Sequence, residues 1–415
     1  SMNNIKKIVT FPSPHEIWPP EPDELELRDL VEQRKSDISI RGRTGSIKRL
    51  EDNFLGFLEG QAKWCISFNS GTSALLAAYF AIGIQEGDEV ICPVLTYHAA
   101  ISPLFILRGV PILVDIDRYT RGIDPNLIEA KITPKTKAIL VVHQWGHPGD
   151  MDKILNIAKK HKLKVIEDCS HAHGSLYKGK FVGTLGDVGI FSLQTQKMMF
   201  SAEGGLLVTN NQEYHDRATL LGHYRDRPRD EIKDDFYQSL WVTGYGLKLR
   251  MSPLSAVTAI HSLRKLKTRI EGRKKCLNFF SEGIKDLPEI EIPFIAPWAD
   301  MGAWYGYKPL IKLEKLNITS RTEYVQRLVD YGVEVSAPSA PLLSTLPLYV
   351  LKENRMFIGC ENPSSEKNKN EHFPVAEMLE STSLSLPTFT DWEHCKPIIE
   401  QYIEAFRQTS KDFGR

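Results

Sequence analysis

Short apolar runs alternate with helical segments between residues 63 and 211, and this alternation constrains the fold of the 415-residue chain most. Each apolar run is continuous, as expected of strands that are buried on both faces. The expected strands are 64–68, 90–91, 111–115, 137–143 and 163–168, and helices are expected over 72–84 and 150–161. The pattern predicts an α/β fold with a mostly parallel central sheet covered by helices. Ligands of such sheets bind beyond the carboxyl ends of the strands.

Three regions are predicted along the chain. Residues 1–45 are expected to form an N-terminal arm, because Trp18-Pro19-Pro20-Glu21-Pro22 favours an extended segment. Residues 46–264 are predicted to form the large α/β domain. Residues 265–415 contain shorter strand-like runs between helices and are predicted to form a smaller C-terminal α+β domain.

Two local predictions concern the second half of the chain. A long helix is expected to begin after Ser252, an N-cap serine followed by Pro253, and to continue to about Leu277. Residues 361–371 are polar and predict an exposed loop.

The composition excludes several classes of partner. Lys+Arg 52 balances Asp+Glu 52, so the formal net charge of +0 predicts binding neither to nucleic acid nor to an acidic membrane. The six cysteines have no metal-ligand spacing, so no metal site is expected, and they predict reduced thiols in the cytoplasm. The N-terminus lacks the apolar core of a signal peptide, and no apolar run is long enough to span a membrane.

Lys197 lies between two apolar runs, 188–192 and 206–209, that are both expected to be buried strands. A lysine that is shielded from water loses its proton more easily and becomes a nucleophilic amine, the form that makes Schiff bases. A surface lysine on a turn between two strands is an equally good interpretation of this spacing alone.

Four other features fall at strand ends. Asn69-Ser70-Gly71-Thr72-Ser73 joins a strand to a helix and predicts either an anion cradle or a plain helix cap. Tyr97 follows the strand at 90–91 and could stack on a flat ring or pack in the core. Asp168 ends a buried strand, where its carboxylate needs a partner such as a pyridine nitrogen, or caps the next segment. Ser192, five residues before Lys197, could add a hydroxyl to the cradle.

These features form a linked set that resembles the DegT/DnrJ/EryC1/StrS family of sugar and cyclitol aminotransferases, which have the aspartate aminotransferase-like fold type I. The resemblance covers nearly the whole chain. The matching segments are 70–75, 93–97, 114–117, 149–152, 167–174, 186–192, Lys197, 203–205 and 384–387.

The resemblance implies a homodimer with shared active sites and pyridoxal 5'-phosphate as the cofactor. Lys197 would hold the cofactor covalently, Asp168 would pair with the pyridine nitrogen and Tyr97 would stack on the ring. The phosphate would be held by Gly71, Thr72, Ser73 and Ser192.

Two positions depart from the pattern of the family. His171 stands where many members have glutamine, near the ring hydroxyl, and this change could alter the protonation of the cofactor. Lys248 stands where many members have an asparagine that reaches the phosphate of the neighbouring subunit. Lys248 could make that contact as a cation, or the contact could be absent.

The expected reaction is a two-stage amino transfer from L-glutamate or L-glutamine to a keto sugar or ketocyclitol. Gln194 resembles the ketocyclitol and aminohydroxybenzoate-type members more than the nucleotide-sugar members, and a nucleotide-linked keto sugar, a sugar phosphate or another keto sugar is an alternative acceptor. Arg225, Arg227 and Arg229 could meet a phosphate or carboxylate, or lie in a solvated loop. There are two rival interpretations: a dehydratase or lyase on the same scaffold, and a non-catalytic sensor. In one sibling group that performs dehydration, histidine replaces the lysine, so Lys197 argues against that group.

Overall fold

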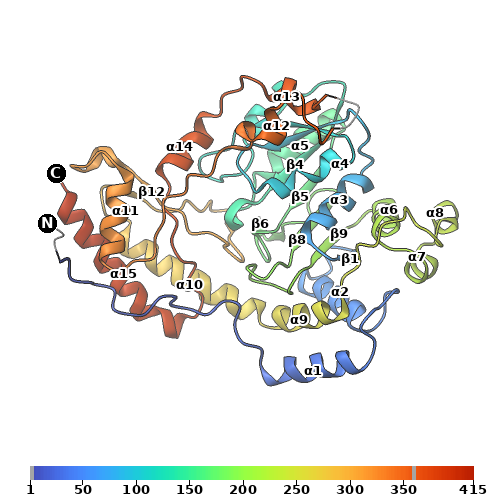
Figure 1. Ribbon diagram of the computed structural model, residues 1–415, viewed down its shortest axis with the longest axis horizontal. Coiled ribbons are helices and arrows are strands. Elements are labelled where there is room, and N and C mark those ends of the chain that lie inside the picture. The colour runs from blue at the N-terminus through green and yellow to red at the C-terminus, as the bar shows by residue number, and fades with distance from the viewer. Residues whose placement is uncertain (1–3, 358–360) are drawn as a thin grey trace.

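The computed structural model describes residues 4–357 and 361–415. Its centre is a seven-stranded sheet in the order β1-β9-β8-β5-β4-β2-β3 (Figure 1). Strand β9 pairs antiparallel with both neighbours, and the other strand pairs are parallel, as predicted. The strands are β1 (Trp64–Phe68), β2 (Glu89–Pro93), β3 (Val110–Val114), β4 (Thr136–Val142), β5 (Lys164–Asp168), β8 (Val188–Ser192) and β9 (Gly205–Thr209).

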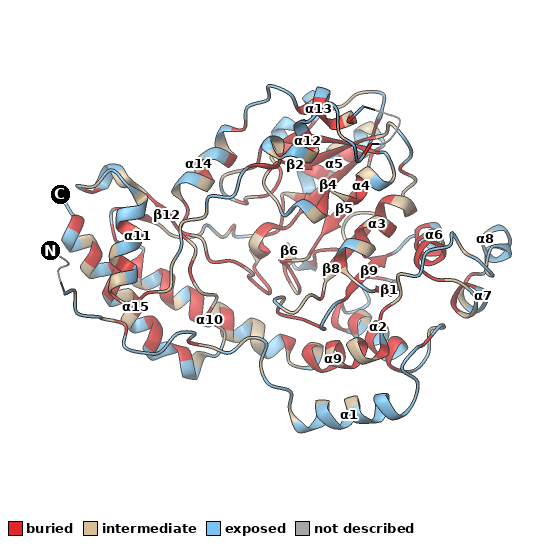
Figure 2. Ribbon diagram, viewed as in Figure 1, coloured by how far each residue is buried: buried red, intermediate tan, exposed pale blue. Residues whose placement is uncertain are grey.

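Both faces of the sheet are covered by apolar side chains, because strand residues alternate between two buried clusters. One face packs against α2 (Gly45–Phe57), α5 (Met151–His161) and α9 (Pro253–Arg264). The other face packs against α3 (Gly71–Ala81), α4 (Pro103–Ile106), α6 (Gln212–Gly222) and α14 (Pro374–Thr382). The sheet is therefore the buried layer between two layers of helices (Figure 2).

The N-terminal segment differs from the predicted extended arm. Residues 24–35 form the helix α1 (Glu24–Lys35), which has no buried residue. Its aspartate N-cap, Asp23, accepts a hydrogen bond from the Glu26 N–H and is paired with Arg264. Leu25, Leu27 and Val31 stay exposed, so α1 lacks the apolar face that would have announced a helix in the sequence.

A separate apolar core lies in the C-terminal part of the chain. It is built mainly from α10 (Leu266–Ile284), α11 (Arg321–Asp330) and α15 (Trp392–Phe413), with β10 (Ile290–Glu291) and β12 (Leu310–Ile311) as a two-stranded sheet. A second small sheet contains β11 (Ala299–Asp300), β6 (Leu176–Tyr177) and β7 (Lys180–Phe181). The division of the chain at residues 45 and 264 stays a prediction.

The long helix predicted after Ser252 is two helices. Ser252 does cap α9, because its Oγ accepts a hydrogen bond from the Leu254 N–H, and Pro253 occupies the first turn. The helix ends at Arg264, Lys265 interrupts the helical geometry, and α10 begins at Leu266. The apolar spacing continues across the break, although the packing partner changes: α9 packs mainly against the sheet, and α10 packs mainly in the C-terminal core.

The predicted exposed loop at 361–371 is wrong. This segment contains α13 (Pro363–Asn368), which lies beside α12 (Pro347–Val350) (Figure 1). Two other short helices, α7 (Asp226–Glu231) and α8 (Asp235–Ser239), lie in a different part of the molecule, near α6. The Asn368 side chain is buried and pairs with the edge of β3, accepting from the Leu113 N–H and donating to the Pro111 carbonyl. A polar side chain here replaces a neighbouring strand.

Two other sequence predictions concern membranes and thiols. Within the described ranges, no helix combines the length and apolar character needed to cross a bilayer. Five cysteines, Cys65, Cys92, Cys169, Cys276 and Cys395, are buried and free, and Cys360 lies outside the described residues.

Candidate active site

A cavity of about 690 Å³ opens at the carboxyl ends of the parallel strands, where the sequence predicted a site. It brings together Gly71, Thr72, Tyr97, Asp168, His171, Ser192 and Lys197. Ser73 and Lys248 do not line it. The structure thus gathers seven of the nine predicted residues from positions spread over 127 residues of sequence.

The N-terminus of α3 forms one end of the cavity. Ser70 caps this helix, since its Oγ accepts a hydrogen bond from the Ser73 N–H at 3.0 Å. A Cβ at Gly71 would lie 2.8 Å from the Cβ of Ser192, and one at Gly205 would lie 2.3 Å from the Ser70 carbonyl oxygen. Both glycines are therefore required for the close approach of these segments, and the free N–H groups of the helix start make a cradle for an anion.

Asp168 ends β5 and is 5% exposed. One of its oxygens, Oδ1, accepts a hydrogen bond from the Ser170 N–H at 3.0 Å. Burial raises the pKa of its carboxyl group, although Ser170 and Lys197 oppose that shift. A cationic nitrogen placed against this carboxylate would offset the cost of its burial.

Lys197 lies on the loop between β8 and β9 and is half-buried, so the alternative of a surface lysine on a turn is wrong. Its Nζ lies 4.1 Å from the centre of the Tyr305 ring. Burial lowers its pKa, and Asp168 acts in the opposite direction. From the N-terminal segment, Trp18 holds the loop by donating from Nε1 to the Thr195 carbonyl at 2.9 Å. The amine is therefore fixed, shielded and easier to deprotonate than an ordinary lysine.

His171 is enclosed by two aromatic rings. It stacks on Trp145 at 4.9 Å and on Tyr305 at 4.3 Å between ring centres. Its Nδ1 accepts a hydrogen bond from the Trp145 N–H at 3.2 Å, which leaves Nε2 to carry the proton. Burial, followed by the positive charge of Lys197, lowers the pKa of His171 well below its usual value. His171 is thus a neutral hydrogen-bond donor.

A buried carboxylate supports the strand end from behind. Glu167 Oε1 accepts hydrogen bonds from His143 Nε2 and the Gly183 N–H, both at 2.9 Å. Its Oε2 accepts from the N–H groups of Leu185 and Gly186, at 3.0 and 2.7 Å. This network ties the loop before β8 to the residue that precedes Asp168.

Three predicted positions need separate comment. Tyr97 lines the cavity and is 66% exposed, so it is not a core residue. Lys248 is exposed and lies outside the cavity lining. The idea that Arg227 meets a ligand is wrong, because its guanidinium is 1% exposed and bound to Glu51 at 2.6 and 2.7 Å.

Other cavity residues escaped the sequence reasoning: Trp145, Tyr305, Arg121, Lys308 and Glu380. Trp145 follows β4, so the rule that ligands bind at strand ends could have identified it. Tyr305, Lys308 and Glu380 come from the C-terminal third of the chain, and no local spacing connects them with the sheet.

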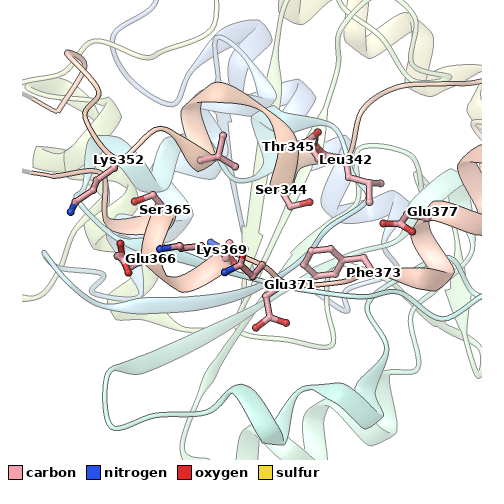
Figure 3. Close-up of a pocket in the computed structure, with 13 residues that line it drawn as sticks. Leu342, Ser344, Thr345, Lys352, Ser365, Glu366, Lys369, Glu371, Phe373 and Glu377 are labelled. Carbon is pink, nitrogen blue, oxygen red and sulfur yellow. Dashed lines mark hydrogen bonds between the residues drawn. The ribbon is translucent and has the colours of Figure 1, made fainter.

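A second pocket, of about 410 Å³, lies between residues 342 and 377 (Figure 3). It contains none of the predicted site residues. Its labelled charged side chains, Lys352, Glu366, Lys369, Glu371 and Glu377, are of both signs, so it favours neither an anion nor a cation.

The fold and the first cavity define a class: an α/β enzyme of the pyridoxal phosphate fold type I. Comparison with known proteins narrows this class. The sequence profile of the DegT/DnrJ/EryC1/StrS aminotransferase family matches residues 20–399, and the chain belongs to that family. It is a pyridoxal 5'-phosphate-dependent aminotransferase, as the sequence predicted.

Relatives of known name are similar over nearly the whole chain. The chain is 30% identical to GDP-perosamine synthase of Escherichia coli O157:H7, over 91% of this chain and 96% of the relative. It is 32% identical to L-glutamine:2-deoxy-scyllo-inosose aminotransferase of Streptoalloteichus tenebrarius, over 91% and 90%. An aminotransferase structure from Psychrobacter cryohalolentis superposes with a TM-score of 0.81 at 26% identity, covering 96% and 99% of the two chains.

Proposed function

We propose that the enzyme moves an amino group from L-glutamate or L-glutamine to the ketone of a keto sugar or ketocyclitol, in the biosynthesis of an amino sugar or aminocyclitol. The names of the two relatives support these substrate classes, since one makes a nucleotide-linked amino sugar and the other aminates a cyclitol ketone. The observation that carries the proposal is that Lys197 and Asp168 line one cavity with the N-terminus of α3.

Lys197 and Asp168 are assigned the catalytic roles. When bound, pyridoxal phosphate supplies an aldehyde for the amine and an electron-accepting ring. The shielded amine of Lys197 would hold that aldehyde in its neutral form and would also serve as the base that moves a proton at the substrate carbon. Asp168 would hold the ring nitrogen in its protonated form, because a buried carboxylate is stabilised by an adjacent cation.

Binding of the cofactor is assigned to the residues around it. The phosphate would be held by the N–H groups at Gly71 and Thr72, by the Ser192 hydroxyl and, through the helix cap, by Ser73. Tyr97 would supply an aromatic face for the ring. His171 would offer its Nε2 proton to the ring oxygen as a neutral group.

A homodimer in the cytoplasm completes the proposal. Tyr97, Phe236 and Tyr245 are 66–68% exposed, as expected of residues that a second subunit would cover. Lys248 is exposed and free to reach the phosphate of a partner subunit. In this proposal, the Lys248 side chain makes as a cation the contact that an asparagine makes in many members of the family.

The test combines absorbance with product analysis. Lys197→Ala is expected to abolish transfer and the absorbance of the lysine-bound cofactor, because no other amine replaces it at the aldehyde. The protein should be incubated with L-glutamate or L-glutamine and a panel of keto sugars and ketocyclitols. Full transfer by Lys197→Ala, or release of ammonia or water without transfer by the unaltered enzyme, would refute the proposal in favour of a lyase or dehydratase.

A further inference from the structure

One wall of the cavity carries Arg121, Lys308 and Glu380, charged side chains that the proposed mechanism does not use. Arg121 lies between β3 and β4, Lys308 lies between β11 and β12, and Glu380 is on α14. Segments far apart in the sequence therefore place two cations and one carboxylate in the same cavity, and these three side chains together have a formal charge of +1.

Neither Arg121 nor Lys308 is neutralised by an ion pair with a carboxylate of the described residues. Arg121 donates from one nitrogen to the Lys308 carbonyl at 2.5 Å and forms no ion pair with a described residue. Lys308 Nζ donates to Ser385 Oγ at 2.6 Å and lies 4.4 Å from the centre of the Trp145 ring. Its ammonium group likewise has no carboxylate within ion-pair distance among the residues of 4–357 and 361–415. Most of their donor capacity is thus free to bind a ligand.

Glu380 interacts electrostatically with both Arg121 and Lys308 but forms no ion pair with either of them. Its Oε2 is shielded from solvent and has no hydrogen-bond partner in the described part of the chain. Arg321 braces this wall by donating to the carbonyls of Glu380 and Ser383, both at 2.8 Å, and of Pro338 at 3.0 Å. The backbone that carries Glu380 is therefore held in place before a ligand arrives.

The electrostatics of Arg121 and Lys308 favour an anion beside them. Burial lowers the pKa of Arg121 to about 10, and burial followed by the charge of Arg121 lowers the pKa of Lys308 to about 8. Both shifts mean that the charged forms are destabilised where they stand. A negative group between them would remove that cost.

We propose that Arg121 and Lys308 form a subsite for an anionic oxygen group, a carboxylate or a phosphate, of the substrate that reacts at Lys197. This inference rests on the proposed aminotransferase reaction and names how its substrates are recognised. The subsite lies close to the reacting amine, because the stacked rings of Trp145, His171 and Tyr305 connect the two lysines: Lys308 Nζ lies 4.4 Å from the centre of the Trp145 ring, and Lys197 Nζ lies 4.1 Å from that of Tyr305. The anion could belong to the amino donor or to a phosphorylated acceptor, and both would use the same contacts.

The binding test uses the cofactor-loaded protein without turnover. Succinate and inorganic phosphate are titrated calorimetrically into the unaltered enzyme, Arg121→Gln and Lys308→Met, with Lys308→Gln as a second variant if one does not fold. Each substitution is expected to weaken binding by roughly tenfold to a hundredfold, because a charge-assisted hydrogen bond is lost. Arg118→Gln is the matched control, since Arg118 lies on the same loop but pairs with Glu291 at 2.7 Å.

Glu380→Gln separates a charge effect from a structural one. It removes the carboxylate that repels an anion, so succinate and phosphate are expected to bind more tightly. A loss of binding equal to that of the cation variants would show that all three substitutions merely disturb the wall, and this result would overturn the subsite. Absence of anion binding to the unaltered enzyme, or binding unaffected by Arg121 and Lys308, would overturn it as well.

The source of the anion is identified from the two half-reactions. A higher KM for L-glutamate or L-glutamine in the donor half-reaction, with kcat little changed, assigns the subsite to the donor carboxylate. The same change only with phosphorylated acceptors assigns it to the acceptor. If the unaltered protein binds anions through Arg121 and Lys308 but transfers no amino group, the subsite stands and the proposed function fails.

Discussion

Replacing Glu167 by glutamine is the sharpest test of how the strand end beside Asp168 is held. The carboxylate of Glu167 accepts four hydrogen bonds, two on each oxygen, and the residue is fully buried. Glutamine keeps one acceptor oxygen and places an NH₂ group where the other was. Whichever way the amide turns, two of the four donors lose their acceptor and face N–H groups.

The expected cost follows from that count. Each buried donor left without a partner costs about 1–3 kcal/mol, so Glu167→Gln should lower the free energy of unfolding by roughly 2–6 kcal/mol. The measurement is urea unfolding of the cofactor-free protein, with Glu86→Gln as the control because Glu86 is exposed. An unfolding midpoint for Glu167→Gln that coincides with that of the unaltered protein would refute the reasoning.

Four further predictions test other parts of the structure. Arg227→Met should destabilise the protein by about 3 kcal/mol in the same assay, because it removes two charge-assisted hydrogen bonds from the buried Glu51 and leaves Arg43 as its cationic partner; a change below 1 kcal/mol would contradict this. Gly205→Ala should weaken binding of pyridoxal phosphate at equilibrium, because its Cβ would collide with the backbone of Ser70 and Gly71, and unchanged affinity would disprove the close approach. Uptake of pyridoxal phosphate by the cofactor-free protein should accelerate with rising pH as Lys197 loses its proton, with a midpoint below 10.5, because burial lowers the pKa of this amine. Asp168→Asn should move that midpoint lower still, since Asp168 raises the pKa of Lys197, and a midpoint that rises would show the opposite coupling.

The sequence predicted those parts of the fold and site that depend on local pattern. Continuous apolar runs identified the parallel strands, and strand ends identified Asp168 and the segment that contains Gly71, because parallel strands present their carboxyl ends at one edge. Lys197 was found in the same way, but burial alone distinguished it from a surface lysine. Chemistry at strand ends is therefore readable from sequence when the neighbouring strands are regular.

Three misses have a common physical cause, since each depends on what a segment packs against. Helix α1 has no buried face to give a periodic signal, and α13 is hidden because the buried groups that fix it are polar. The break at Lys265 is invisible because apolar spacing continues while the packing partner changes. Spacing records which residues are apolar and says nothing about which core receives them.

Because spacing does not show which segments pack together, the sequence predicted the cavity residues at the strand ends and missed those from the C-terminal part of the chain. The cradle, Asp168 and Lys197 come from the regular sheet, whereas Tyr305 and Lys308 come from a segment paired with the chain by the isolated bridge Tyr307–Leu386. Tyr305 nevertheless contacts both Lys197 and His171, so the C-terminal part of the chain completes the surroundings of the reacting amine. The segments at the strand ends carry the groups assigned to the cofactor, and the less regular segment carries Tyr305 and Lys308 on loops, where changes in sequence are best tolerated. Substrate preference should therefore follow residues such as Lys308 rather than the strand-end residues that bind the cofactor.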